Sequence, residues 1–455
     1  MWYYFYSIEN VVFTTLSVKS IRSFLTGRMK NMLRRKASQM AMQTQLIAVF
    51  FCLSALAAAP SLAQQAPSST EEVGGIGVHS DEAIPVGPFI FSPALQLAWQ
   101  DRDNIFFTPD NEIRDQLILA KAQLLFEVPI YESYLRFSYT PQYREYKEYE
   151  LDDKWQHFFD AAAAFEFSSG LTLNLGYSYI IGNLETREVD PGGEVFFGDR
   201  RFDKQWARVA GDYWITGRDG FIFNASWEDL KHEDPELFYD YNRLTGGIGW
   251  LHQLSPILVM DVKYGIIDFD AHDSPLENND YRDSVSHSLT AGFRGQLSPV
   301  VATELRLGYG VVKFDPAPEE PQVEDFEGAI VNGFISWEMA HGSVLRLDVL
   351  RMPYPSAYGD NANYLASGAS LMYSLDRGSL FGQLRGRFQN NDYSRPDRDT
   401  GEDRSDDIYT FGVGLGYRFT YYLSLWGTYL YEDRQSIYDY SYTINTFTLG
   451  LVVGF

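Results

Sequence analysis

The chain has 455 residues, of which 45% are hydrophobic and 16% aromatic, and its mean hydropathy is −0.24. Its 61 Asp and Glu residues outnumber 37 Lys and Arg residues, which gives a net charge of −24 and argues against a nucleic-acid-binding protein, because such a protein needs a basic face. The many Tyr, Phe, Leu and Val residues argue against a largely disordered chain. A polar average with abundant aromatic residues is typical of a transmembrane β-barrel.

Residues 1–63 have the pattern of a secretory targeting sequence. Basic residues between Lys30 and Lys36 precede an apolar run from Leu46 to Ala58, and Ser61-Leu62-Ala63 forms a small-x-small cleavage site. This pattern predicts an upstream extension followed by a signal peptide that is cleaved near Ala63. The apolar run is shorter than a helix that spans a bilayer. Residues 64–88 are rich in Pro, Gly, Ser and Glu, and we expect them to form a flexible periplasmic tail.

From residue 89 to the C-terminus, apolar and polar residues alternate with a period of two. Leu305, Leu307 and Tyr309, for example, alternate with Arg306 and Gly308. Such alternation places one set of residues on each face of a sheet, and in a barrel the apolar set faces lipid while the polar set faces the lumen. The expected fold class is therefore an all-β, transmembrane, antiparallel up-and-down β-barrel over residues 89–455.

We expect about 18 strands, and 16 remain possible because the alternation is weak at 221–230 and 423–432. The predicted strand cores are 89–100, 117–127, 133–147, 154–167, 171–184, 205–216, 221–230, 242–254, 257–269, 284–297, 300–314, 327–338, 343–352, 363–374, 379–390, 407–419, 423–432 and 445–455. Short turns alternate with long polar segments, which is the layout of periplasmic turns and external loops. The longest segment, 185–204, is a candidate constriction lined by Arg200, Arg201 and Lys204.

The last strand carries apolar residues at every second position back from the terminal residue. This pattern predicts a lipid-facing strand that closes the barrel. It also resembles the signal that outer-membrane proteins present to the barrel insertion machinery, and it places the protein in the outer membrane of a Gram-negative cell, in contact with lipid and lipopolysaccharide. The residues of this predicted signal are Phe447, Leu449, Leu451, Val453 and Phe455.

The polar face of the strands supplies candidate pore-lining residues of both signs, which suggest either basic rings that attract anions or internal ion pairs of the wall. They are Arg136, Arg208, Asp212, Asp261, Lys263, Arg294, Glu304, Arg306, Arg346, Asp348, Arg385 and Arg387. Tyr and Trp residues near strand ends, among them Trp206 and Trp426, are expected mainly in interfacial girdles, with stacking sites for sugars in the lumen as the alternative.

Two stretches resemble the putative β-barrel porin type 2 family. One is Asp101-Arg102-Asp103-Asn104-Ile105-Phe106 after the first strand, and the other is Tyr143-Arg144-Glu145-Tyr146. The first departs from the family pattern at Gln100-Asp101-Arg102-Asp103, where Tyr-Asp-Asp is usual. The resemblance implies an 18-stranded barrel that is often associated with exopolysaccharide secretion, with periplasmic polysaccharide-export components as partners.

Three functions follow as hypotheses. The first is an outer-membrane channel that is the terminal conduit for an exopolysaccharide, the second is a general or solute-specific diffusion porin, and the third is a non-conducting surface or adhesion barrel. No enzyme, cofactor or metal site is expected, because His157, His252 and His287 are isolated on strands and no hydrolase or phosphate-binding motif occurs. No nucleic-acid partner is expected either.

Overall fold

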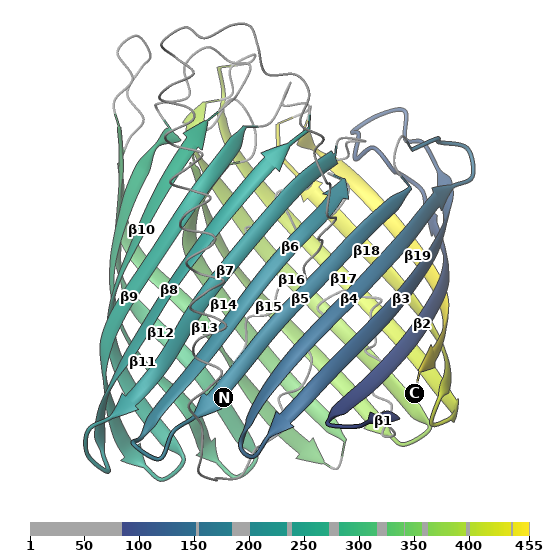
Figure 1. The fold of residues 1–455 in the computed structure, drawn as a ribbon. Helices are drawn as coiled ribbons and strands as arrows, with labels where there is room; N and C mark the ends of the chain where they lie inside the picture. Colours follow the sequence, from purple (N-terminus) through teal and green to yellow (C-terminus); the bar gives the residue numbers. More distant parts are fainter. Residues whose placement is uncertain are drawn as a thin grey trace, which may run out of the picture.

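The computed structural model describes residues 84–151, 154–183, 201–233, 239–272, 282–315, 325–340, 342–356, 363–396, 401–437 and 440–454. Within these residues the chain forms one closed antiparallel sheet of 18 strands with a single extra strand outside the ring (Figure 1). The predicted fold class is confirmed, and the weakly alternating segments at 221–230 and 423–432 are strands. None of the described residues belongs to a helix of the length and apolarity needed to cross a membrane.

The ring strands are 12 to 18 residues long, and most extend beyond the predicted cores because their backbone pairing continues past the alternating segment. The extra strand is β1 (Ile84–Val86), and the ring consists of β2 (Phe89–Arg102), β3 (Asp115–Ile130), β4 (Ser133–Tyr146), β5 (Trp155–Glu166), β6 (Leu171–Asn183), β7 (Arg201–Trp214), β8 (Asp219–His232), β9 (Asp240–Ser255), β10 (Leu258–His272), β11 (Ser284–Ser298), β12 (Val301–Phe314), β13 (Phe326–Ala340), β14 (Ser343–Pro355), β15 (Asn363–Arg377), β16 (Leu380–Pro396), β17 (Asp403–Thr420), β18 (Leu423–Gln435) and β19 (Tyr442–Gly454).

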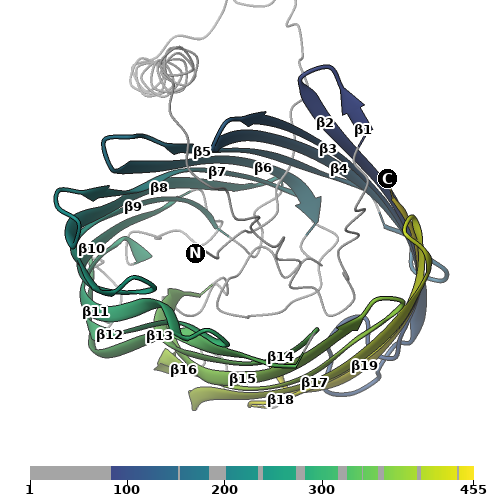
Figure 2. The same cartoon turned by 90° about the horizontal axis from the view of Figure 1, so that it is seen from below.

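The barrel closes where β2 pairs with β19. Their register runs from Thr446 opposite Arg102 to Gly454 opposite Ala94. Below Ala94 the same edge of β2 is covered by β1, which pairs with Phe89–Phe91. Figure 2 shows β1 beside β2 and close to the C-terminal end of the chain. This edge of β2 is therefore paired along most of its length, except at Ser92 and Pro93. Residues 84–86 of the expected flexible tail thus form a strand, and residues 64–83 lie outside the described residues.

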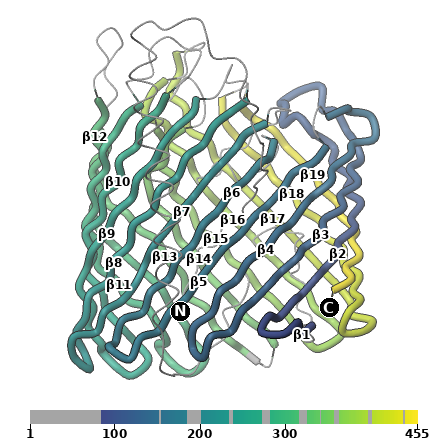
Figure 3. The backbone as a smooth tube through the Cα atoms, in the orientation of Figure 1, coloured from purple at the N-terminus to yellow at the C-terminus, as the bar shows by residue number. Residues whose placement is uncertain are grey.

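Large apolar side chains lie on the outward face of the sheet. Leu415, Ile248 and Leu289 expose 61%, 60% and 58% of their surface, as expected for side chains that contact lipid. The outward residues alternate with polar or small residues on the inner face, and this alternation explains the low mean hydropathy. The strands run obliquely to the barrel axis (Figure 3), as strands must in a closed barrel.

Short turns gather at one end of the barrel (Figure 1), and we take this end as periplasmic. Gly170 and Gly378 adopt positive φ angles of 82° and 65° in these turns, a conformation that favours glycine. The predicted constriction at 185–204 is partly wrong, because Arg201 and Lys204 belong to β7. Residues 184–200, which include Arg200, lie outside the described residues.

Candidate functional site: the inner wall and its rim

The inner face of the barrel is identified by contacts between strands that are not neighbours. Arg294 of β11 donates from Nη2 to Oδ2 of Asp212 in β7 at 2.6 Å. Three strands, β8 to β10, lie between them in the sheet. Two side chains can meet across three intervening strands only on the concave side of the wall. The strand register then assigns every second residue of each ring strand to the lumen.

All 12 predicted pore-lining residues lie on this inner face, in the part of each strand nearest the periplasmic turns. Arg387, the farthest from its turn, is seven positions after the first residue of β16, and Asp212 is two positions before the end of β7. They form a charged zone in the periplasmic half of the barrel, from β4 around to β16. Their role in lining a conducting pore remains a prediction.

At least four of the eight basic residues in this zone form ion pairs with carboxylates of the wall. Arg136 binds Glu127 at 2.6 Å, and Arg346 binds Asp348 at 2.7 Å. The other two such pairs reach over at least one strand: Arg294 contacts Asp212 as described, and Arg306 of β12 binds Asp261 of β10 at 3.0 Å and also contacts Glu304. These contacts fit the hypothesis that many of the inner charges stabilise the wall.

The other four basic residues have different surroundings. The Arg208 guanidinium lies 5.0 Å from the ring centroid of Trp206, and Arg387 donates to Gln389. Within the described residues, the side chains of Lys263 and Arg385 form neither a hydrogen bond nor an ion pair. Positive charge therefore exceeds paired negative charge on this part of the wall, which favours anions in the adjacent lumen.

Glycines on the inner face let several of these long side chains lie flat. An ideal Cβ at Gly176 would lie 2.9 Å from Nε of Arg208, and one at Gly247 would lie 2.6 Å from Cε of Lys263. At Gly292 the nearest side-chain atom is Cγ of Arg306, at 2.6 Å. The basic side chains therefore occupy the space that a neighbouring side chain would fill.

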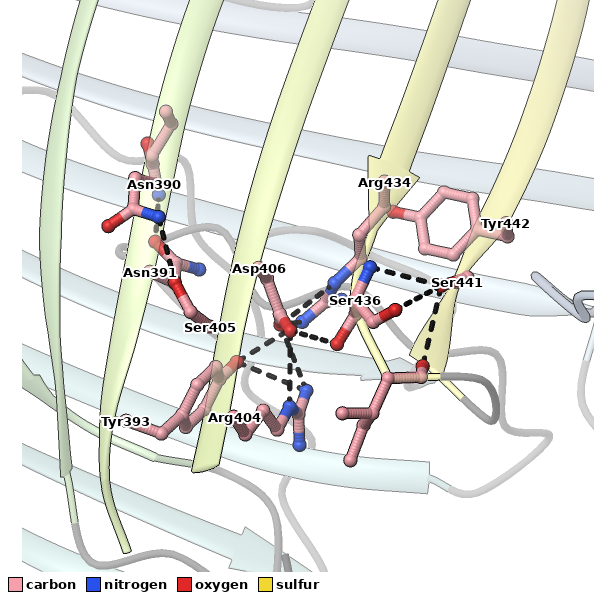
Figure 4. A network of polar contacts seen from close by, with 12 residues as sticks. Asn390, Asn391, Tyr393, Arg404, Ser405, Asp406, Arg434, Ser436, Ser441 and Tyr442 are labelled. Atoms are coloured by element: carbon pink, nitrogen blue, oxygen red, sulfur yellow. Dashed lines mark hydrogen bonds and ion pairs between the residues drawn. The ribbon is translucent and has the colours of Figure 1, made fainter. Parts of the chain in front are cut away.

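At the extracellular end, β16 to β18 hold a buried polar network (Figure 4). Asp406 accepts from Nη2 of Arg404 at 3.1 Å and from Nε of Arg434 at 3.0 Å, and Ser436 donates to the same carboxylate. The hydroxyl of Tyr393 accepts from both guanidinium groups, at 3.2 and 3.1 Å. Asp406, Arg404 and Arg434 are each at most 1% exposed. Sequence analysis missed this network, because nothing local distinguishes its charges from those of an external loop.

A second buried group lies on the inner face of β7 to β9. Glu228 forms an ion pair with Nζ of Lys204 at 3.2 Å, accepts from the hydroxyl of Tyr241 at 2.6 Å and also binds Arg243. Lys204 therefore stabilises the wall and does not belong to a constricting loop.

The girdle prediction is wrong for Trp206 and Trp426. Trp206 and Trp426 lie on the inner face, since their register partners Ser178 and Gly450 do. Trp426 is only 2% exposed and lies flat over Gly450, where an ideal Cβ would come within 2.4 Å of its ring. Neither ring can anchor the barrel at the lipid interface.

The last strand has the orientation that was predicted. Phe447, Leu449 and Leu451 point outward and are 36–45% exposed, whereas Val453 is half-buried. Their role as an insertion signal remains a prediction, and Phe455 lies outside the described residues.

The three strand histidines lie on the outward face, each stacked on an aromatic ring. The partners are Trp155 for His157, Trp250 for His252 and Tyr264 for His287. In the part of the chain that the structure describes, no group of three or more His, Cys, Asp or Glu residues is placed to hold a metal ion.

The family model described as putative beta-barrel porin 2 matches residues 259–455. The resemblance inferred from the sequence is confirmed over this range, although residues 101–106 and 143–146, on which it was based, lie outside the match. Together with the closed 18-strand fold, this match makes the protein a porin-like β-barrel of the outer membrane.

Solved structures with a similar fold include three outer-membrane proteins. Acinetobacter baumannii OccAB3 is 10% identical with a TM-score of 0.46, and the alignment covers 81% of this chain and 100% of that chain. For the Pseudomonas aeruginosa outer membrane protein opdK these values are 11%, 0.45, 81% and 99%, and for P. aeruginosa OccK3 they are 13%, 0.44, 81% and 96%. Such likeness says nothing about the solute. No curated protein matches the chain.

Proposed function

We propose that this barrel is the outer-membrane conduit for a secreted exopolysaccharide with anionic groups. The observation that carries the proposal is the excess of basic side chains on the inner wall. Eight of the 12 pore-lining candidates are basic, and the side chains of Lys263 and Arg385 form no ion pair or hydrogen bond with the described residues. Positive charge on a water-filled pore wall attracts anions and lowers the electrostatic barrier to their passage.

The polymeric nature of the solute is supported by the width of the barrel and by the family resemblance. A ring of 18 strands is in the size range that leaves an aqueous channel. The resemblance implies a link with exopolysaccharide secretion, so we include periplasmic polysaccharide-export components among the partners, with outer-membrane lipid and lipopolysaccharide around the wall.

Deletion of the gene tests the proposal. We expect secreted polysaccharide to fall and polymer to accumulate in the periplasm, and the wild-type gene should restore secretion. Complementation with the double variant Lys263→Gln, Arg385→Gln should restore less secretion, because both basic groups are lost. Unchanged secretion in the deletion strain would refute the export function.

A solute-specific diffusion porin is the second candidate, and the ion pairs of Arg136, Arg294, Arg306 and Arg346 favour it, since charges that are neutralised within the wall contribute little to the attraction of a polyanion. Planar-bilayer recordings under a salt gradient separate the candidates. An anion-selective pore in a protein whose deletion leaves secretion intact would support the porin. If the barrel passes no ions and the deletion strain secretes normally, both channel functions are refuted and only the non-conducting surface-barrel hypothesis remains.

A further inference from the structure

The first external segment, residues 103–114, is tied to the last strand by a buried asparagine. Asn104 is 0% exposed. Its Nδ2 donates to the carbonyl oxygens of Thr108 at 2.7 Å and of Thr443 in β19 at 3.2 Å, and its Oδ1 accepts from the backbone N–H of Thr108 at 3.1 Å. One side chain thus closes a five-residue turn and attaches it to the far end of the barrel sequence.

The preceding residue extends the closure of the barrel. The Asp103 carboxylate accepts from the backbone N–H of Asn445 at 2.7 Å and from its Nδ2 at 2.6 Å, and the Asp103 N–H donates to the Asn445 carbonyl at 3.2 Å. These bonds lie directly beyond Arg102 and Thr446, the last residues paired between β2 and β19. The start of the segment is therefore fixed to the wall.

The segment then turns to the lumen side of the wall. Ile105 is fully buried against Leu117 of β3, Tyr146 of β4 and Leu151. Leu117 and Tyr146 are register partners on the inner face, whereas the next residue, Ile118, is 56% exposed on the outward face. Ile105 must therefore pack from inside the barrel.

Phe107 contacts β19, the strand on the other side of the barrel closure. Its ring centroid lies 5.2 Å from that of Tyr442 in β19, a residue of the inner face. Its φ angle is +55°, a left-handed conformation that is strained for a bulky side chain. Because Phe107 lies within the turn that Asn104 closes, the hydrogen bonds of Asn104 oppose relaxation of this backbone.

We propose that residues Asp103–Thr108 form a fixed apolar lip on the lumen side of the extracellular mouth, held by Asn104 as a positioning residue, and that this lip limits the size of the solutes that pass. On the inner side of β19 to β4 the lip presents Phe106 and Phe107, and Ile105 packs beneath it against the wall. The limit on solute size rests on the proposed channel function, whereas the fixed position of the lip does not.

Cysteine labelling tests the position of the lip. The one cysteine of the chain, Cys52, lies in the predicted signal peptide, so an introduced cysteine would be the only thiol of the mature protein. Ile105→Cys should react with a membrane-impermeant maleimide at least ~10-fold more slowly than the matched control Ile113→Cys, because burial shields a thiol. Ile113 is in the same segment and is 50% exposed. Adding Asn104→Ala should accelerate labelling of Ile105→Cys and leave Ile113→Cys unchanged. Equal labelling of the two single variants would overturn the proposal.

Conductance tests the role of the lip. Asn104→Ala should give larger and noisier single-channel currents than the wild type, after its folding has been verified by heat-modifiable mobility on gels. If that variant does not fold, Asn104→Asp retains the acceptors but loses the donors to Thr108 and Thr443, and the same change is expected. Folded variants with wild-type currents and slow labelling of Ile105→Cys would refute the role of Asn104. A wild-type barrel that passes no ions would refute the channel, while the labelling still decides whether the lip is fixed.

Discussion

Neutralising Asp406 should destabilise the barrel more than any conservative change on its surface. In Asp406→Asn the carboxylate that Arg404 and Arg434 share becomes a neutral amide. Both guanidinium groups are 1% exposed, so neither can turn to water without opening the wall. Two buried positive charges would then lie together without their counterion.

The structure allows a rough magnitude for this change. Removing one partner of a buried ion pair costs about 3–5 kcal/mol, because the remaining charge is left uncompensated. Asp406 has two cationic partners and also accepts from Ser436. Tyr393 accepts from both arginines and offsets part of the loss. We therefore expect the free energy of unfolding to fall by about 3–5 kcal/mol.

The neighbouring residue provides a matched control. Asp407 lies on the outward face and accepts from Nδ2 of Asn390 at 2.9 Å, so Asp407→Asn should cost less than about 1 kcal/mol. Both variants can be compared with the wild type by urea unfolding in lipid vesicles, followed by tryptophan fluorescence. The reasoning would be refuted if Asp406→Asn unfolded within about 0.5 kcal/mol of the control.

Three further substitutions test other parts of the wall. Gly450→Ala should lower the free energy of unfolding by about 1–3 kcal/mol, because its Cβ would meet the Trp426 ring at 2.4 Å. The matched control Gly386→Ala has no atom within 4 Å of its Cβ and should leave the free energy of unfolding nearly unchanged. Equal unfolding free energies for the two variants would contradict this prediction. Leu449→Arg should lower stability by about 2–4 kcal/mol if its side chain contacts the middle of the lipid layer, and wild-type stability in vesicles would argue against that contact. Arg385→Ala should shift the reversal potential toward lower anion selectivity, and an unchanged potential would show that this charge does not act on permeating ions.

Much of the barrel was predictable because its determinants are local. Alternation identified the strand at 300–314 without knowledge of its partners, and the same period assigned Arg306 to the inner face. The weak strands at 221–230 and 423–432 were harder, since Trp227 and Trp426 fall on opposite faces and blur the distinction between the apolar and polar sets.

The contacts that organise the inner wall could not be predicted in this way. The bond between Asn104 and Thr443 joins residues 339 positions apart, and that between Arg294 and Asp212 joins residues 82 positions apart. Both depend on how the closed sheet curves, which no local pattern encodes. The start of β7 was missed because Arg201 and Lys204 resemble loop residues in composition, although Lys204 pairs with a buried carboxylate.

The basic side chains that lie flat on the inner wall make the width of the pore sensitive to substitutions at neighbouring glycines. Arg208, Lys263 and Arg306 each occupy space left by a glycine on an adjacent strand. A methyl group at Gly176 or Gly247 would lift the neighbouring cation off the wall and move its charge toward the barrel axis, whereas at Gly292 it would first meet the backbone oxygen of Leu305 at 2.4 Å. The aperture could therefore be narrowed, and its field strengthened, without changing the number of charges. Glycines on the inner face would then determine both the width of the pore and the distance of these charges from its axis.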